Sequence, residues 1–253
     1  MQMDPQIVFS YGLTKSGSTL AYQLVLVALE RAGHPQPALR LPGVTVSRRI
    51  NAIEHLDADA AARMRAAVAA HGHPVAFKTH TRPDPAVRDM VRAGALAHAV
   101  VRDPRDIALS MVDHGVRARA ARKPAFAEIH HLDDALRGID GQMETLAQWL
   151  ALPGVRILRY DRLAFDTVAA TAAILEHLGL DGDPQAIADE VLSRRFIQLN
   201  AGRRDRHRAE MSAADSARIR ARYAPFYDLV LPEGAPPPPP GTPLTAPLPA
   251  GAR

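Results

Sequence analysis

The sequence predicts an α/β fold: a single domain whose central parallel sheet is flanked by helices. Short apolar runs at 7–9, 74–78, 96–101 and 155–158 alternate with helix-forming segments, which is typical of parallel sheets covered on both faces. The first run enters a turn rich in Gly, Lys and hydroxyl residues and then a helix, an arrangement that binds phosphate or sulfate. With 253 residues, the chain is long enough to form a full core.

The order of residues in this turn separates it from the nucleoside-triphosphate P-loop. That loop reads G-x-x-x-x-G-K-[ST], with the lysine after the second glycine. Here the turn reads Lys15-Ser16-Gly17-Ser18-Thr19, so the lysine stands two residues before the glycine. The turn is therefore P-loop-like, and an anion is its expected ligand.

The remaining elements follow from start and stop signals along the chain. A helix is expected from residue 18 to residue 31, because Gly33 and Pro35 stop it. Asp103 as N-cap and Pro104 at the first helical position begin another helix. Segments 35–50 and 117–135 are interpreted as an irregular connection and as a mobile loop or broken helix. Further helices are expected at 57–71, 142–150, 167–178, 184–194 and 213–224.

Composition excludes several classes of site. The chain has no cysteine, so disulfides, thiolate metal sites and cysteine nucleophiles are excluded. A net charge of +4 and a pI near 9.7 suit an anionic ligand but do not by themselves indicate nucleic acid. No stretch has the length of a membrane span, and the N-terminus lacks a leader-like pattern, so we expect a cytoplasmic protein with no membrane partner.

The C-terminal segment differs in composition from the rest. Residues 232–253 contain nine prolines, five of them consecutive. Such a segment cannot pack a core and is expected to be disordered or to form polyproline II. The predicted organisation is one α/β domain over residues 1–231 and a Pro-rich tail over 232–253.

Candidate functional residues follow each predicted strand. Lys15 comes after the first, Lys78 and His80 after the second, Arg102 after the third and Tyr160 after the fourth. In parallel α/β sheets, ligands bind beyond the carboxyl ends of the strands. The sequence therefore predicts that these five side chains converge on one site.

Three segments resemble the PAPS-dependent sulfotransferases of the cytosolic type. Segment 13–20, Leu-Thr-Lys-Ser-Gly-Ser-Thr-Leu, is similar to the family's 5′-phosphosulfate loop, P-K-S-G-T-T-W. Segment 77–80, Phe-Lys-Thr-His, is similar to the K-T-H segment with the catalytic histidine. Segment 101–110 is similar to the 3′-phosphate motif R-x-P-x-D-x-x-x-S. The resemblance implies a P-loop NTPase-like sulfotransferase fold. Segment 158–161, Leu-Arg-Tyr-Asp, is less similar to the family's Y-E-D-L strand end.

The resemblance implies catalytic roles for three residues. His80 would be the general base that takes the acceptor's proton, a role suited to an imidazole. Lys15 would stabilise the leaving phosphate at the bridging oxygen, and Lys78 would assist the sulfuryl group. The alternatives are surface roles: the chain has 11 histidines, and a lysine such as Lys78 is often simply solvated. His114, His130 and His131 have no comparable support, although the last two would suit an acceptor pocket.

Donor-binding residues are implied in the same way. The backbone from Ser16 through Gly17 and Ser18 to Thr19 would hold the 5′-phosphate, together with the Thr19 hydroxyl. The 3′-phosphate would be bound by Arg102 and Ser110, which lies two helical turns into the following helix. We add Tyr160, Arg203 and Arg204 to the donor-binding set. The alternative for Arg102 is a structural ion pair with Asp103 or Asp106, and Asp103 itself is interpreted as a helix cap.

Two departures from the family pattern stand out. Leu20 occupies the position where the family has a tryptophan against the adenine. The family's C-terminal signature is replaced by a stretch, 194–222, with nine arginines and three acidic residues. Arg203, Arg204, Arg206 or Arg208 would then cover the 3′-phosphate. The alternative is a solvated basic helix face.

The resemblance implies an enzyme that moves a sulfuryl group from PAPS to a small-molecule acceptor and releases adenosine 3′,5′-bisphosphate. The acceptor group is expected to be a hydroxyl, with an amine as second choice, and no metal and no nucleic acid are expected to take part. The alternatives are a P-loop kinase that uses ATP and magnesium, and a non-catalytic basic nucleotide- or nucleic-acid-binding protein. The sequence carries no signal for the oligomeric state.

Overall fold

A six-stranded, mostly parallel sheet forms the centre of the computed structural model, which describes residues 7–48, 50–194 and 203–231. The strand order is β2-β3-β4-β1-β5-β6. All neighbouring strands pair in parallel except β2 with β3. The strands are β1 (Ile7–Gly12), β2 (Val44–Ser47), β3 (Ile50–Ile53), β4 (Val75–Thr79), β5 (Leu96–Val101) and β6 (Arg156–Arg159). The predicted α/β class is confirmed.

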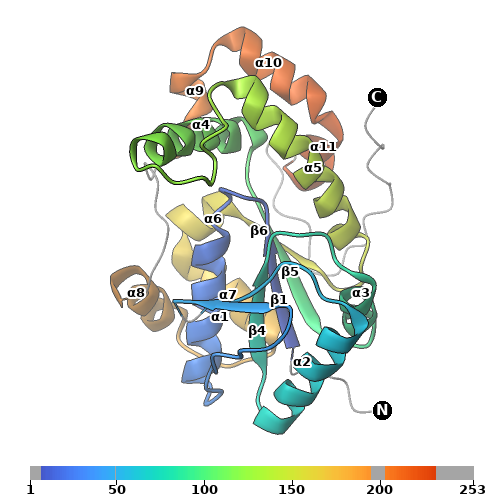
Figure 1. Ribbon diagram of the computed structural model, residues 1–253. Helices are drawn as coiled ribbons and strands as arrows, with labels where there is room; N and C mark the ends of the chain where they lie inside the picture. Colours follow the sequence, from blue (N-terminus) through green and yellow to red (C-terminus); the bar gives the residue numbers. More distant parts are fainter. Residues whose placement is uncertain (1–6, 49, 195–202, 232–253) are drawn as a thin grey trace.

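Helices cover both faces of the sheet (Figure 1). One face carries α1 (Ser18–Arg31), α7 (Thr167–Leu178) and α8 (Pro184–Arg194), which form a common apolar cluster. The opposite face carries α2 (Ala58–His71), α3 (Pro85–Arg92) and α5 (Leu132–Leu150). The short α6 (Tyr160–Phe165) follows β6 directly. Helices α4 (Pro104–Ala120), α9 (His207–Glu210), α10 (Ala213–Arg222) and α11 (Ala224–Val230) gather at the upper end in Figure 1.

The central strand β1 shows why the apolar runs form strands rather than helices. All six of its residues are buried, and alternate side chains enter the cores on opposite faces. Phe9 and Tyr11 pack on Trp149 of α5, with ring centroids 6.1 and 5.2 Å apart. Val8 faces α1 on the other side. Buried on both faces, β1 fixes the position at which the Lys15 turn begins.

The connection 35–50, expected to be irregular, contains β2 and continues into β3. Thr45 and Val46 pair with Ala52 and Asn51 in an antiparallel hairpin at the edge of the sheet. The hairpin has few apolar residues, but Ile53 of β3 packs in the main core. A four-residue strand that buries only part of one face leaves little periodic signal, which explains the difference.

The segment 117–135 is more regular than expected. Helix α4 continues to Ala120, and α5 begins at Leu132 rather than near 142. The intervening backbone packs directly on Gly115, where an added Cβ would lie 2.2 Å from the Ile129 carbonyl oxygen. The Arg119 guanidinium donates to the carbonyls of Ala127 and Ile129, at 2.8 and 2.7 Å. These contacts hold the connection against α4.

The tail 232–253 lies outside the described residues, so the predicted division into 1–231 and 232–253 stays a prediction. Within the described ranges, none of the helices combines the length and apolar character that crossing a bilayer requires. The cytoplasmic location also stays a prediction.

Candidate active site

The turn after β1 is built to present backbone N–H groups. Lys15 and Gly17 both adopt left-handed backbone conformations, with φ of 66° and 84°. Because Gly17 is the N-cap of α1, no side chain caps the first helical turn. The Ser16 hydroxyl turns inward and donates to the Leu13 carbonyl at 2.6 Å. The uncapped N–H groups and the positive end of the helix dipole make this turn an anion site.

Arg102 reaches this turn from the end of β5. Its Nη1 donates to the Lys15 carbonyl oxygen at 3.1 Å, which joins two segments 87 residues apart. The Arg102 guanidinium also lies on the Tyr160 ring, with its Cζ 3.9 Å from the ring centroid. Tyr160 in turn covers Gly17, where an added Cβ would lie 2.8 Å from Tyr160 Cδ2. The structure thus brings together residues that follow β1, β5 and β6.

Arg102 is buried, and its acidic neighbours are engaged elsewhere. Asp106 forms a long ion pair with Arg102 at 3.8 Å, as the alternative interpretation of Arg102 expected, and it accepts two shorter bonds, both of 2.9 Å, from the backbone N–H and the Nδ1 of His207. Asp103 is the N-cap of α4 and is bound by Arg105 and by the Tyr227 hydroxyl. The capping role expected for Asp103 is confirmed, and the shorter contacts of Asp106 are with His207 of α9. The guanidinium of Arg102 keeps capacity for an anion.

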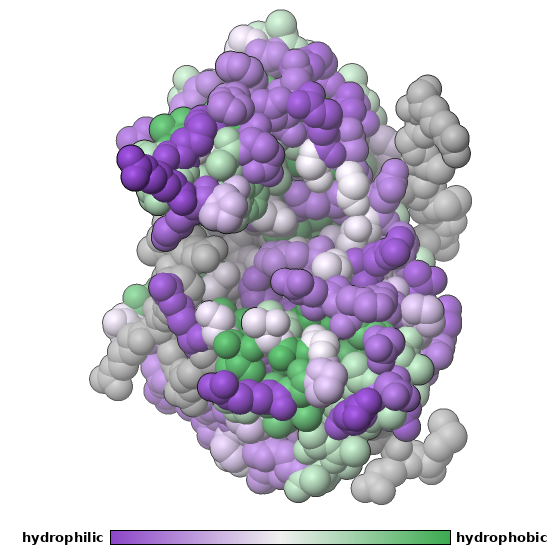
Figure 2. Space-filling model, viewed as in Figure 1, coloured by the Kyte–Doolittle hydropathy of each residue, from purple (hydrophilic) through white to green (hydrophobic). Residues whose placement is uncertain are grey.

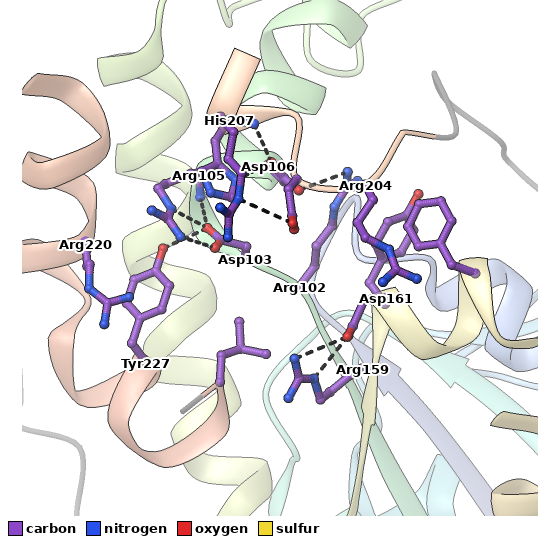
Figure 3. A pocket seen from close by; sticks show the side chains of 15 residues that line it. Arg102, Asp103, Arg105, Asp106, Arg159, Asp161, Arg204, His207, Arg220 and Tyr227 are labelled. Atoms are coloured by element: carbon purple, nitrogen blue, oxygen red, sulfur yellow. Dashed lines mark hydrogen bonds and ion pairs between the residues drawn. The ribbon is translucent and has the colours of Figure 1, made fainter. Parts of the chain in front are cut away.

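A cavity of about 270 Å³ opens beside Arg102 (Figure 3). Its walls come from β5 and α4, from β6 and α6, and from the segment 204–231. Six arginines and four aspartates line it. The arginines are Arg102, Arg105, Arg159, Arg204, Arg208 and Arg220, and the aspartates are Asp103, Asp106, Asp161 and Asp205. The excess of guanidinium groups favours a ligand with negative charge.

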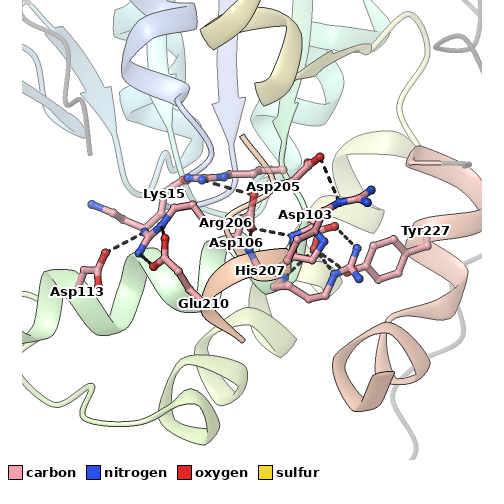
Figure 4. A network of polar contacts seen from close by, with 12 residues as sticks. Lys15, Asp103, Asp106, Asp113, Asp205, Arg206, His207, Glu210 and Tyr227 are labelled. Atoms are coloured by element: carbon pink, nitrogen blue, oxygen red, sulfur yellow. Dashed lines mark hydrogen bonds and ion pairs between the residues drawn. The ribbon is translucent and has the colours of Figure 1, made fainter. Parts of the chain in front are cut away.

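The basic C-terminal segment contributes unequally to this cavity. Arg204 lines it, and its guanidinium lies over the Phe165 ring at 4.9 Å. Arg208 also lines it and pairs with Asp205. Arg203 is exposed and is not among the lining residues. Arg206 is buried and tied to Asp113 and Glu210 (Figure 4), so its contacts are structural.

His80 and Lys78 form a second group at the end of β4. The carbonyl oxygen of Gly12 lies 2.7 Å from His80 Nδ1, which must carry a proton to donate to it. His80 Nε2 is then the unprotonated nitrogen, and Lys78 Nζ lies 2.5 Å from it. Burial and the Lys78 charge lower the pKa of His80 to about 4, and burial lowers the pKa of Lys78 to about 8. His80 is exposed to solvent although protein surrounds it on most sides, so part of this neutral ring is accessible.

The backbone after β4 is held firmly. The Trp149 indole N–H donates to the Thr81 carbonyl at 2.9 Å, and the Thr81 hydroxyl donates to the Glu54 carbonyl at 2.7 Å. Together with the Gly12 contact, these bonds fix the position of the His80 ring.

Lys15 points to a partner that sequence reasoning did not select. Its Nζ lies 3.2 Å from Nδ1 of His114, on α4. Burial, Arg117 and Arg102 lower the pKa of Lys15. Ser110, one turn before His114 on the same helix face, is buried in α4 and is not among the residues that line the Arg102 cavity. The spacing of four from Ser110 was the only signal in the sequence that placed His114 near the site.

Two more residues of the site escaped sequence reasoning. The Thr14 N–H donates to Gln142 Oε1 at 2.6 Å, so α5 supports the Lys15 turn from 128 residues away. Phe165 lies edge-on to Tyr160, with ring centroids 6.0 Å apart, and supports Arg204. Neither position belongs to a recognisable motif.

Comparison with protein families decides the class of the protein. The sulfotransferase domain model matches residues 5–212, most of the 253-residue chain. This chain belongs to the sulfotransferase family. It is therefore an enzyme of sulfuryl transfer, and the resemblance seen in the three motifs is confirmed. Comparison with curated proteins gave no match.

Several solved structures are similar to this chain. The chain is similar to a retinol dehydratase bound to androsterone and the inactive cofactor PAP, with 16% identity and a TM-score of 0.54, over 87% of this chain and 80% of that one. For the same enzyme bound to retinol and PAP, the identity is 16% and the TM-score 0.55, over 87% of this chain and 81% of that one. For a sulfotransferase from Alicyclobacillus acidocaldarius, the identity is 16% and the TM-score 0.44, over 87% of this chain and 92% of that one. The two retinol dehydratase comparisons show that this chain shares its overall fold with that enzyme.

The position of Leu20 differs from the family pattern in a defined way. Leu20 is buried in the cluster between α1 and the sheet. It belongs to the core on that face. The aromatic rings that line the Arg102 cavity are instead Tyr160, Phe165 and Tyr227.

Proposed function

We propose that this enzyme transfers a sulfuryl group from PAPS to a hydroxyl of a small-molecule acceptor and releases adenosine 3′,5′-bisphosphate. The observation that carries the proposal is the direct contact between Arg102 and the Lys15 carbonyl. Two cationic sites, the turn before α1 and the Arg102 cavity, therefore lie side by side. A nucleotide with phosphates on both its 5′ and 3′ positions matches that pair.

In this proposal, the turn binds the 5′-phosphosulfate. The N–H groups of Gly17 to Thr19 surround the 5′-phosphate, and the Thr19 hydroxyl adds a further donor. Ser16 shapes the turn, since its N–H and its hydroxyl both donate to the Leu13 carbonyl. Arg102 and Arg204 bind the 3′-phosphate. Ser110, on α4, is the third residue proposed for this phosphate. Arg203, exposed and outside the cavity lining, is the weakest member of the proposed set. Tyr160 holds Arg102 in place and covers Gly17.

The chemical step uses the residues at the ends of β1 and β4. His80 Nε2 takes the proton of the acceptor hydroxyl, and the oxygen attacks the sulfur. The bond between sulfur and the bridging oxygen breaks, and its electron pair stays on the 5′-phosphate. Lys15 stabilises that charge, and Lys78 turns from His80 to the sulfuryl oxygens. Positioning and charge stabilisation supply most of the acceleration in such a step.

The tautomer of His80 supports its role as base. Donation from Nδ1 to the Gly12 carbonyl leaves Nε2 unprotonated, with its lone pair towards the Lys78 ammonium, and a pKa near 4 keeps the ring neutral around pH 7. An amine acceptor would use the same base. The hydroxyl is preferred because a neutral imidazole is most useful to an acceptor that must lose a proton during attack.

The kinase alternative would need a carboxylate at the end of β5 to hold magnesium. Asp103, the acid at the end of β5 that would hold magnesium in a kinase, is occupied by Arg105, the Tyr227 hydroxyl and the start of α4. Within the described residues, no group of three or more His, Asp or Glu side chains is arranged to hold a metal ion.

Thermal-shift measurements test the assignment. Adenosine 3′,5′-bisphosphate should raise the melting temperature, whereas ATP with magnesium and a mixed oligonucleotide should not. Incubation with PAPS and a panel of alcohols, phenols and amines should then give sulfated product. Stabilisation by ATP-magnesium together with ATP turnover would support the kinase instead.

A further inference from the structure

The contact between Lys15 and His114 lies at the proposed leaving group. Lys15 is the residue proposed to stabilise charge on the 5′-phosphate, and its Nζ lies 3.2 Å from His114 Nδ1. The two residues come from different elements, the turn after β1 and the middle of α4, and are 99 positions apart. An ammonium has no lone pair, so Lys15 is the donor and His114 Nδ1 the acceptor.

The surroundings of His114 favour its neutral form. Burial and the charges of Lys15, Arg117 and Lys123 lower its pKa. The ring also packs edge-on against Phe126, with ring centroids 4.8 Å apart. Phe126 at the same time lies 5.7 Å from the Lys15 ammonium. The imidazole is thus fixed by an aromatic ring from the connection after α4, and it is held in the state that accepts a hydrogen bond.

Lys15 needs such a partner. Its backbone is left-handed, and a lysine side chain has several rotatable bonds whose freedom is lost when the ammonium is fixed. A group that is already positioned before the substrate binds does not lose that freedom during the reaction. The neighbouring cations Arg102 and Arg117 repel the ammonium and the Asp113 carboxylate attracts it, while His114 Nδ1 supplies a directed hydrogen-bond acceptor.

We propose that His114 is a positioning residue for sulfuryl transfer, whose unprotonated Nδ1 holds the Lys15 ammonium at the turn where the 5′-phosphate leaves. This inference rests on the proposed function. His114 acts through Lys15 and is not itself expected to touch the donor. Removing its acceptor atom should therefore slow the chemical step more than it weakens nucleotide binding.

Two substitutions separate the acceptor atom from the shape of the side chain. H114N keeps an oxygen near the position of Nδ1, whereas H114L keeps bulk but removes the acceptor. The probe is turnover of PAPS, either to water or to an acceptor from the panel above, measured as formation of adenosine 3′,5′-bisphosphate. The dissociation constant of that product is measured for each protein.

We expect H114L to lower kcat about 10-fold and to change the dissociation constant less than about threefold, because one positioning hydrogen bond is lost. H114N should restore kcat to within about threefold of the natural protein. A purely structural role predicts that both variants lose stability together and that H114N gives no rescue. Equal kcat in all three proteins, or equal loss in both variants, would overturn the role of His114.

A second measurement tests the contact between Lys15 and His114 without measuring turnover. The ring of His114 is titrated by NMR in the natural protein and in K15M. Loss of the neighbouring ammonium should raise the pKa of His114, and an unchanged pKa would contradict the contact. A natural protein that neither binds the bisphosphate nor consumes PAPS would overturn the proposed function itself, whereas an active natural protein with an indifferent H114L overturns only this inference.

Discussion

Histidines occupy two contrasting regions of this enzyme, and the contrast shows what marks a functional site. His98 and His177 lie between β5 and α7, where burial lowers their pKa values to about 3 and about 4. His80 and His114 lie at the site, and their pKa values are lowered as well. His98 is fully buried and His177 is half-buried, whereas His80 is open to solvent and both site histidines face lysines. A lowered pKa is therefore common to both regions, and access with a cationic partner distinguishes the site.

The hydrogen bonds of the two regions differ in the same sense. His98 Nε2 pairs with the Ser10 hydroxyl at 2.8 Å. Within the described residues, His98 Nδ1 and His177 Nε2 are buried without a hydrogen-bond partner. A proton on either of these nitrogens would have no acceptor inside the fold, whereas both nitrogens of His80 have partners, the Gly12 carbonyl and the Lys78 ammonium.

Replacing His80 should have the largest effect on sulfuryl transfer, whereas replacing the buried His98 should have little. H80A should lower sulfuryl transfer by about 10²- to 10⁴-fold, the usual contribution of a general base. The affinity for adenosine 3′,5′-bisphosphate should change less than about threefold, since His80 is not placed at either phosphate. H98Q, which keeps an acceptor for Ser10, is the control and should leave transfer near the natural rate. An equal loss of binding and turnover in H80A would contradict the role as base.

Arg102 should dominate nucleotide affinity. R102M removes a charge-assisted hydrogen-bonding group, worth about 1.5–3 kcal/mol, so binding of the bisphosphate should weaken about 10- to 150-fold. R162M is the control, because Arg162 pairs with Asp166 in an exposed contact away from the cavity. Calorimetry of both variants checks the expectation. Comparable loss in the two would show that general positive charge, and not the Arg102 position, attracts the ligand.

His98 and His177 should make the free energy of unfolding fall at acid pH. The pKa values of His98 and His177 lie below the usual 6.5, so folding favours their neutral forms. Their stabilising contribution is complete above pH 6.5 and is lost as the pH falls from 6.5 towards 4. The slope is at most about 1.4 kcal/mol per pH unit for each histidine. Urea unfolding at pH 7, 6 and 5 should give a shallower slope for H98Q, and parallel slopes would contradict this assignment.

The smallest effect concerns the cover of the turn by Tyr160. Gly17 and Gly33 both have a φ of 84°, so replacing either by alanine introduces similar backbone strain, about 1 kcal/mol. Only at Gly17 would the new Cβ meet another side chain, Tyr160, since nothing lies within 4 Å of that position at Gly33. G17A should therefore weaken nucleotide binding, and G33A should affect stability alone. Equal nucleotide affinity in both variants would show that Tyr160 does not need to lie on the turn.

Sequence reasoning placed the parallel core and the site-bearing turns well, because those features are local. The apolar runs that became β1, β4 and β5 are buried on both faces, the edge strand β6 is partly buried, and the polar ends of all four were visible as motifs. The β2–β3 hairpin and the ordered connection after α4 were missed. Their stability comes from distant contacts, such as the close approach at Gly115, which no local pattern records.

The same limit applies within the site. The sequence identified Lys15, His80 and Arg102 from their place after strands, and the structure brings them to one end of the sheet. The pairing of Lys15 with His114, the support of the turn by Gln142 and the stacking of Arg204 on Phe165 join residues between 39 and 128 positions apart. Such partners become visible only when the chain is folded. The exposed Arg203 and the cavity-lining Arg204 were likewise indistinguishable in the linear pattern.

The central claim is that adjacent cationic sites bind the two phosphates of one nucleotide. Calorimetry with adenosine 3′,5′-bisphosphate and with adenosine 5′-monophosphate tests it most directly, in the natural protein and in R102M. The account predicts that the natural protein prefers the bisphosphate by about 10- to 150-fold, in line with one charge-assisted contact, and that R102M loses most of this preference. Equal affinity of the natural protein for the two nucleotides would contradict the claim.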